Sequence, residues 1–321
     1  MKPSFHVRPF SGPFDDPGLY VRFLREGRAM IFDLGYTNTL SPRDILKTTE
    51  IFISHTHIDH FIGFDNILRI SLKKERPLKL YGPEGFTACI EGKLRGYTWN
   101  LIEDYPLIIE VHEVAGGSVR ETEFRAGNSF VREELGTKTF SGELLKDNLC
   151  TVRAVSLDHR VPCLAFSLEE DVHVNIDKAR LSSLGLPVGP WLKQLKASVR
   201  EKNEDSVFTV NGRTYTYKEL NGVASITRGQ KLSYVVDAAG SEENVRKIVD
   251  LVKGSDVLYI ETCFLDADKD RARDRYHLTA KEAGRIARQA GVGRLEAIHF
   301  SPRYMDKPEM LYQEAKEEFG K

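Results

Sequence analysis

Short apolar runs bounded by turn residues alternate along this chain with segments whose apolar residues recur at helical spacing. The apolar runs predict β-strands at Leu19–Leu24, Ala29–Leu34, Glu50–Ser54, Lys79–Tyr81, Ile108–His112, Cys150–Leu157, Leu164–Leu168, Leu232–Asp237, Val257–Glu261 and Ala297–Phe300. The helical spacing predicts helices at Ile62–Lys74, Pro83–Lys93, Ser241–Val252, Ala280–Ala290 and Lys307–Glu318.

Capping residues support two of these helices. Ser241 precedes acidic residues, as an N-cap does, and Thr279 with Glu282 forms the pattern of a capping box. Gly291 suits a helix C-cap. The early strands follow one another as in hairpins, whereas the late strands alternate with helices. This order predicts an α/β layered domain with mixed sheets in place of a purely parallel doubly wound fold.

One segment departs from this pattern. Residues 171–228 contain polar turns, many charges and a Gly-Leu-Pro-Val-Gly-Pro run at 185–190. We expect an appendage inserted within a single domain that covers residues 1–321, without a separate core of its own. A solvated, loop-rich excursion is an equally good reading of its composition.

Charge and composition narrow the function classes. Lys+Arg 46 against Asp+Glu 47 gives a net charge of -1, which excludes a globally basic nucleic-acid binder, so any polyanion must meet a local patch. Hydrophobic residues at 41% exclude a disordered chain. No apolar run is long enough to span a bilayer, and no signal peptide opens the sequence. We expect a cytoplasmic protein without a membrane, with reduced thiols at scattered positions: Cys89, Cys150, Cys163 and Cys263.

The strongest chemical signal follows a predicted strand, in Ile53-Ser54-His55-Thr56-His57-Ile58-Asp59-His60. His55 and His57 project to the same side of an extended segment and can chelate one metal ion. Asp59 and His60, on the turn that follows, can face a second ion. Imidazole and carboxylate together suit Zn²⁺ or a similar first-row ion.

A dinuclear site needs further ligands, and three other strand ends offer them. His159 follows the run that ends at Leu157, Asp237 ends an apolar strand, and His299 lies in Ala297–Phe300. A carboxylate bridge is needed to hold two dications close together. The expected ligand sets are His55, His57 and His159 for one ion, Asp59, His60 and His299 for the other, and Asp237 as the bridge.

The motif His-Thr-His-Ile-Asp-His resembles the signature of the metallo-β-lactamase fold, and later motifs resemble the ribonuclease Z (tRNA 3′-processing endonuclease) family. The later motifs run in that family's order and are Asp158–Phe166, Gly185–Trp191 with Leu195-Lys196, His277–Ala280 and His299–Tyr304. The chain departs from the family at Phe10–Pro17, which lacks the usual basic residues, and at Val236-Asp237-Ala238, which stands in place of Gly-Asp-Thr.

The resemblance implies a four-layer αββα sandwich with an inserted flexible arm, and a zinc-dependent hydrolase that holds two Zn²⁺ per chain, with Mn²⁺ or Fe²⁺ as alternatives. It implies endonucleolytic cleavage of precursor tRNA 3′ trailers by a metal-bridged hydroxide, with Asp59 and His277 as catalytic residues. Glu261 could orient His277. RNA is the implied partner of a homodimer. The candidate substrate contacts are Lys193, Lys196 and Arg303, with basic stretches at 69–79 and 271–275 as further patches.

Other functions remain open from the sequence. A small-molecule phosphodiesterase, for example for cyclic nucleotides, or another ester hydrolase would use the same metals and would explain the altered loop at Phe10–Pro17. A thiol-ester hydrolase shares the first signature but not the His277 motif. A relative that binds RNA without metals conflicts with the retention of every expected ligand position.

Overall fold

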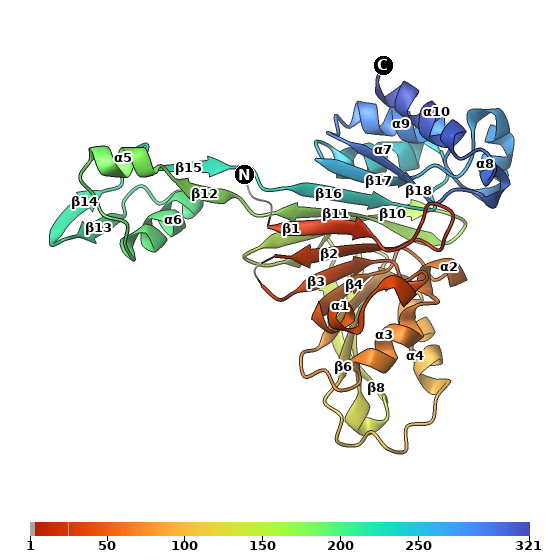
Figure 1. The fold of residues 1–321 in the computed structure, drawn as a ribbon. Helices are drawn as coiled ribbons and strands as arrows, with labels where there is room; N and C mark the ends of the chain where they lie inside the picture. Colours follow the sequence, from red (N-terminus) through yellow and green to blue (C-terminus); the bar gives the residue numbers. More distant parts are fainter. Residues whose placement is uncertain (1–3, 25) are drawn as a thin grey trace. The chain divides into compact units, whose positions relative to one another are not determined.

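The computed structural model describes residues 4–24 and 26–321, and the chain divides into two compact units. Unit 1 contains the residues up to Lys146 together with Thr151–Leu168 and Lys231–Lys321, and unit 2 contains Asp147–Cys150 and Glu169–Gln230. Each unit is described by itself, with the element labels of Figure 1.

Two β-sheets form the centre of unit 1. The first has the strand order β1 to β8, with parallel pairing from β3 to β6 and antiparallel pairing on both sides. The second has the order β18-β17-β16-β11-β10-β9, in which β16, β17 and β18 are parallel. Mixed pairing in both sheets confirms the layered α/β prediction.

The strands of unit 1 have the following bounds: β1 Phe5–Pro9, β2 Leu19–Phe23, β3 Ala29–Phe32, β4 Thr48–Phe52, β5 Leu78–Pro83, β6 Ile108–Ala115, β7 Ser118–Arg125, β8 Arg132–Thr139, β9 Glu143–Lys146, β10 Cys150–Asp158, β11 Pro162–Glu170, β16 Lys231–Val235, β17 Val257–Glu261 and β18 Leu295–Ile298. Its helices are α1 Pro42–Lys47, α2 Ile58–Phe61, α3 Phe64–Ser71, α4 Phe86–Arg95, α7 Glu242–Val252, α8 Lys269–Arg275, α9 Ala280–Gln289 and α10 Glu309–Phe319. Short 3₁₀ turns lie at Thr37–Thr39, Ala126–Asn128, Asp266–Asp268 and Pro302–Tyr304.

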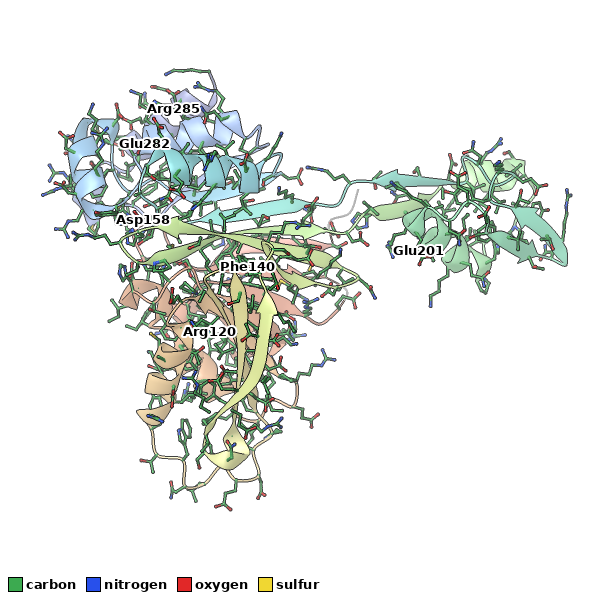
Figure 2. The ribbon with its side chains drawn as sticks, turned by 180° about the vertical axis from the view of Figure 1, so that it is seen from behind. Arg120, Phe140, Asp158, Glu201, Glu282 and Arg285 are labelled. Atoms are coloured by element: carbon green, nitrogen blue, oxygen red, sulfur yellow. The ribbon has the colours of Figure 1, made fainter. Side chains whose placement is uncertain are left out.

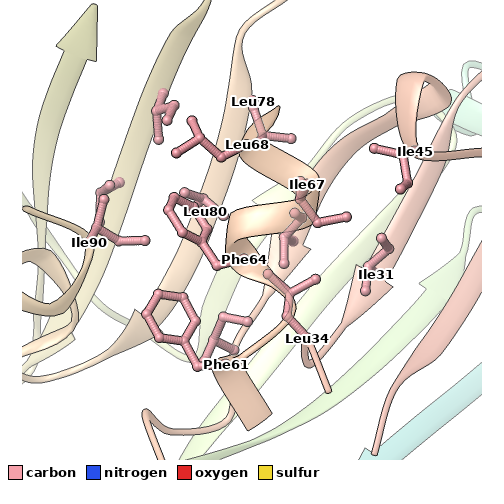
Figure 3. Packing of buried hydrophobic residues seen from close by; sticks show 14 of the residues in the cluster. Ile31, Leu34, Ile45, Phe61, Phe64, Ile67, Leu68, Leu78, Leu80 and Ile90 are labelled. Carbon is pink, nitrogen blue, oxygen red and sulfur yellow. The ribbon is translucent and has the colours of Figure 1, made fainter. Parts of the chain in front are cut away.

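Helices cover the outer face of each sheet, as Figure 1 shows. On the first sheet, Phe64 and Leu68 of α3 pack with Leu80 of β5 and Ile90 of α4 in one apolar cluster (Figure 3). A second cluster joins α7 and α9 to β16 and β17. Between the sheets, the ring of Phe32 lies 5.6 Å from that of Phe166 and 6.0 Å from that of Tyr234. These layers make the predicted αββα sandwich.

The expected caps are present. The Ser241 side chain accepts from Asn244 N, and Thr279 and Glu282 form a complete capping box at the start of α9. Figure 2 labels Glu282 on this helix. The predicted helix Ile62–Lys74 is shorter in the structure, where α3 covers Phe64–Ser71 and Gly63 separates it from the short helix α2. A Cβ atom there would lie 2.3 Å from the Gly35 carbonyl oxygen, so the close approach of two backbones requires glycine.

Unit 2 corrects one expectation. It contains α5 (Lys178–Ser183), α6 (Trp191–Glu201), the antiparallel pair β12 (His173–Ile176) with β15 (Ala224–Thr227), and the hairpin β13 (Val207–Val210) with β14 (Arg213–Thr216). The expectation that this segment lacks a core is wrong, because its buried apolar side chains form a cluster of their own: Val174, Leu181, Leu186, Trp191, Leu192, Leu195, Val199, Phe208, Val210, Leu220 and Val223. These apolar residues are few, and many exposed charged residues lie between them in the sequence. The hydrophobic pattern of the segment therefore did not reveal the core.

Candidate metal centre

The expected metal ligands lie at the carboxyl ends of strands in both sheets of unit 1. His55 and His57 follow β4, and Asp59 and His60 lie on the short helix α2. His159 follows β10 directly after Asp158, which Figure 2 labels. Asp237 and His299 follow β16 and β18. The structure therefore brings residues from position 55 to position 299 into one place.

Two groups of these residues match the ligand sets expected from the sequence, and a third group joins Asp237 and His299 to Glu261 and His277. One ligand atom from each of His55, His57, His159 and Asp237 lies within 4.8 Å of the others, and the same holds for Asp59, His60 and His299. In the second group, Asp59 Oδ2 is 3.3 Å from His60 Nε2 and 3.4 Å from His299 Nε2.

Asp237 lies between the two groups. Its Oδ2 is 3.6 Å from His55 Nε2 and 3.3 Å from His159 Nε2 in one group, and 3.5 Å from His60 Nε2 in the other. Its Oδ1 is 2.9 Å from His299 Nδ1. A carboxylate with contacts on both sides has the position that a bridge between two cations requires.

Several buried polar atoms of this centre face one another without a hydrogen bond to any described residue. They are Nε2 of His55, Nε2 of His60, Oδ1 of Asp237 and Nδ1 of His299, the last two lying 2.9 Å apart as an ion pair without hydrogen-bond geometry. Buried polar atoms in proteins are nearly always paired, so converging unpaired imidazole nitrogens and carboxylate oxygens call for a partner. Neutral imidazole with carboxylate is a ligand set that first-row divalent cations accept. The residues therefore fit divalent metal ions.

The protonation states of the histidines in the centre also fit bound divalent metal ions. Burial, with repulsion from neighbouring histidines, lowers the pKa of His55 to about 2, which keeps that imidazole neutral. Burial opposes the charged form of His299, but the carboxylates of Asp237 and Asp59 outweigh it and raise the pKa to about 10. Bound cations would compensate the buried carboxylates in the same way as a proton on His299.

Asp33 is a functional residue that the sequence reading missed. Its fully buried carboxylate accepts from Ser54 N at 2.6 Å and from the Tyr234 hydroxyl at 3.0 Å, and it lies 2.8 Å from His60 Nδ1. Such a partner fixes the tautomer and the orientation of a metal-binding imidazole. An aspartate directly after the apolar strand Ala29–Phe32 was the available signal.

Three residues of the centre have an unusual backbone conformation that directs their side chains toward it. Asp33, Asp237 and His299 all have positive φ, at 56°, 49° and 56°. Each residue follows a strand that ends at this edge of its sheet. Residues other than glycine occupy this left-handed region rarely and at some cost in energy. Three of the nine described non-glycine residues with positive φ therefore contribute side chains to this centre.

His277 lies beside the metal centre and is held by an acid. Its Nδ1 is 2.7 Å from Glu261 Oε2, while the other Glu261 oxygen accepts from Ala238 N at 2.7 Å. Burial opposes the charged form of His277, but the Glu261 carboxylate outweighs it and raises the pKa. The sequence suggested this pair, and the structure confirms the contact. The hydrogen bond to Nδ1 leaves Nε2 of His277 free for a substrate.

A cavity of about 530 Å³ opens over the centre. Its lining includes His57, Asp59, His159, Asp237, Arg271, Arg275, His277 and His299.

The expected substrate contacts are distributed over both units. Arg303 pairs with Asp268 at 3.4 Å and does not line this cavity. Lys193 and Lys196 are exposed residues of α6 in unit 2.

Solved structures share the fold of this chain. Human tRNase Z, short form, has a TM-score of 0.55 and 19% identity, with 92% of this chain and 93% of that chain covered. A metallo-β-lactamase fold protein from Bacillus subtilis has a TM-score of 0.57 and 14% identity, with 98% and 93% covered. Fold and site together define a metallo-β-lactamase fold protein with a divalent-metal centre.

Sequence relatives narrow this class. Ribonuclease Z of Deinococcus radiodurans is 31% identical over 278 residues, which cover 85% of this chain and 82% of the relative. Ribonuclease BN of Escherichia coli is 32% identical over 265 residues, which cover 81% and 73%. The chain belongs to the ribonuclease Z family and is a metal-dependent hydrolase. This confirms the resemblance seen in the sequence.

No family model matches the chain. Among residues 4–24 and 26–321, the helices are all too short or too polar to cross a bilayer.

Proposed function

We propose that this chain is a phosphodiester hydrolase that cuts 3′ trailers from precursor tRNA. The observation that carries the proposal is Asp237, whose carboxylate joins two ligand groups in a dinuclear arrangement. The names of its relatives, ribonuclease Z and tRNase Z, supply the substrate.

The proposed cofactor is a pair of Zn²⁺ ions, with Mn²⁺ or Fe²⁺ as alternatives, because imidazole and carboxylate ligands suit these metals. His55, His57 and His159 would hold one ion and Asp59, His60 and His299 the other. When bound, two such ions lower the pKa of a water molecule to roughly 7 and stabilise charge on the phosphoryl oxygens.

The protein's own groups prepare the remaining chemistry. Asp33 orients His60, and the Tyr276 carbonyl oxygen lies 2.8 Å from Nδ1 of His159, which leaves Nε2 toward Asp237. Glu261 holds Nδ1 of His277 and favours its protonated form. His277 can then donate the Nε2 proton to the leaving 3′ oxygen as a general acid.

Recognition of the tRNA body is the second part of the proposal. Unit 2 would act as the arm that grips RNA through Lys193 and Lys196, with Arg303 as a further contact. We also propose a homodimer in the cytoplasm. Reduced thiols support this location, because the described cysteines are free.

Metal analysis and product mapping test the function. The purified protein should carry close to two metal ions per chain and cut precursor tRNA at one mapped position, which transcripts with and without a 3′ CCA sequence will locate. The Asp237→Ala variant should lose metal and at least about 100-fold in turnover, because the bridge is gone. Full metal content and full turnover in this variant would refute the assignment. Preference for cyclic nucleotides over tRNA would favour a small-molecule phosphodiesterase.

A further inference from the structure

Two arginines on the wall of the active-site cavity have no role in the metal centre. Arg271 and Arg275 lie on α8, four residues apart and therefore on the same helix face, and both line the cavity over the metal centre. From this placement we propose that Arg271 and Arg275 form a phosphate subsite for a nucleotide next to the scissile bond. The proposal rests on the phosphodiesterase function above and deepens it: the substrate would be an internal phosphodiester of an RNA strand.

The wall that carries these arginines is fixed to the centre. The α8 helix ends at Tyr276 with φ 60°, and the Tyr276 carbonyl oxygen lies 2.8 Å from Nδ1 of His159. His277 N donates to the Ala272 carbonyl at 2.9 Å, and Ala272 is buried in an apolar cluster. Since the C-terminal end of α8 contacts His159 and continues directly into His277, the helix presents its arginines at a defined place.

Their charge is available. Both side chains belong to exposed residues, and among the described residues neither guanidinium has an ion-pair partner. Nearby acids are engaged elsewhere, Asp266 with Lys281 and Asp268 with Arg303. Arginine binds phosphate through several N–H groups.

The position of the pair argues for more than one substrate phosphate. The metal centre can accommodate the scissile phosphate. The two guanidinium groups therefore have a phosphate to bind only if the substrate carries a second one. A nucleic acid strand does so, whereas a cyclic mononucleotide does not. The subsite would therefore favour strand cleavage over small phosphodiesters.

Arg273 supplies a matched control. It lies on the same helix and is exposed, but it pairs with Asp270 at 3.6 Å and does not line the cavity. An effect of general positive charge would appear in Arg273→Ala as well as in a variant that replaces Arg271 and Arg275 by alanine. A subsite effect would appear only in the latter variant.

The experiment compares Arg271→Ala/Arg275→Ala, Arg271→Lys/Arg275→Lys and Arg273→Ala with the wild-type holoenzyme. Binding of a fluorescent single-stranded oligoribonucleotide with hydrolysis-resistant phosphorothioate linkages to the holoenzyme is measured by anisotropy at several salt concentrations. Turnover of the unmodified oligoribonucleotide is compared with that of bis(p-nitrophenyl) phosphate, which has a single phosphate. Cleavage of precursor tRNA is measured in parallel.

The double alanine variant should bind RNA about tenfold or more weakly, and its slope of log Kd against log salt should fall by about 0.7, the value for one lost phosphate contact on a single strand. Its ratio of kcat/KM for RNA to kcat/KM for the single-phosphate substrate should fall about tenfold. The lysine variant should keep the slope because its charge remains, and Arg273→Ala should match wild type.

An unchanged slope in the double alanine variant, or an equal loss in Arg273→Ala, overturns the subsite. Wild-type protein that cleaves bis(p-nitrophenyl) phosphate but no precursor tRNA would instead refute the proposed function. The two failures are therefore distinguishable.

Discussion

At the scale of single residues, the metal centre depends on polar groups that are costly to bury. Asp33, His60 and Asp237 are all fully or almost fully buried. An unpaired buried charge costs several kcal/mol, so each needs a partner. Hydrogen bonds from Ser54 and Tyr234 satisfy Asp33, whereas Asp237 faces histidine nitrogens on two sides. Bound cations would compensate the buried negative charge of the Asp237 carboxylate.

The Glu261→Gln variant tests the His277 assignment. Glu261 raises the pKa of His277, so its removal should lower that pKa. If protonated His277 is the acid, turnover falls as pH rises through its pKa, and the alkaline limb of the pH profile should move to lower pH in the variant. We expect kcat to fall at least about tenfold. The measurement is kcat against pH for bis(p-nitrophenyl) phosphate.

Two controls accompany this profile. Metal content should match wild type, because Glu261 is not among the proposed ligands. A variant with lower turnover but an unshifted alkaline limb would show that Glu261 has a structural role and that His277 is not the acid.

Lys74 offers a test of stability against pH. Burial lowers its pKa to about 8, and its Nζ donates to the Thr48 carbonyl oxygen. Between pH 8 and the unfolded pKa of 10.5, the unfolded chain binds more protons, so this group makes stability rise with pH by up to about 1.4 kcal/mol per unit. The Lys74→Met variant should lose this rise.

Urea unfolding of both proteins at pH 7, 8 and 9.5 measures the difference. The free energy of unfolding of wild type minus that of Lys74→Met should increase with pH across this range. A constant difference would mean that the Lys74 ammonium is solvated in the folded protein.

At the scale of elements, α9 and α10 approach closely at a glycine. A Cβ on Gly284 would lie 2.3 Å from the Ala315 carbonyl oxygen, a backbone atom that cannot move alone. Gly284→Ala should therefore destabilise the protein by about 1–3 kcal/mol despite the better helix propensity of alanine. Gly92 of α4 is the matched control, since its Cβ position has nothing within 4 Å, and Gly92→Ala should stabilise by about 0.5–1 kcal/mol. Thermal unfolding of both variants would contradict this packing if their shifts had the same sign.

Sequence patterns predicted the elements that have a strong apolar signal. Strands such as Ala29–Phe32 and Val257–Glu261 are buried almost throughout, and their apolar runs are plain in the sequence. By contrast, Arg132–Thr139 is an exposed strand at every position, so its register comes from pairing with β7 and not from any hydrophobic pattern. The α6 helix was missed because exposed charges separate its buried residues Trp191, Leu192, Leu195 and Val199.

The candidate site was predicted better than the surrounding loops. Metal-binding side chains at strand ends are rare enough to stand out, and the parallel strands β16, β17 and β18 bring such ends to one edge. Asp33 was missed because a lone aspartate after a strand resembles an ordinary turn residue. Which of Arg271, Arg273 and Arg275 faces the cavity depends on helix phase and on the position of α8, which the sequence does not give.

At the scale of the whole molecule, the long segment of unit 2, Glu169–Gln230, begins and ends at neighbouring residues. Glu170 N donates to the Gln230 carbonyl oxygen at 2.8 Å, and Gln230 N donates to a Glu170 carboxylate oxygen at 3.1 Å. Unit 2 also has its own apolar cluster, so unit 1 does not need it to complete a core. A short loop can therefore replace the segment between these two residues.

Replacement of residues 171–229 by a short glycine-rich linker should leave a folded protein that still hydrolyses bis(p-nitrophenyl) phosphate. Cleavage of precursor tRNA should fall at least about 100-fold if unit 2 grips RNA, because several phosphate contacts are lost together. Circular dichroism and metal content check that unit 1 is intact. An equal loss of both activities would mean that unit 2 has a structural role, and full tRNA cleavage would refute its role in binding.

The metal-binding candidates come from both sheets of the sandwich, and they span His55 to His299 in the sequence. Ions bound by these residues would link the two sheets of unit 1. Because such ions bind the folded protein, a higher metal concentration would raise the melting temperature. During synthesis the last ligand becomes available only after the ribosome has passed His299. The nascent chain therefore cannot assemble the complete centre, and cannot damage cellular RNA with it, before most of the protein exists.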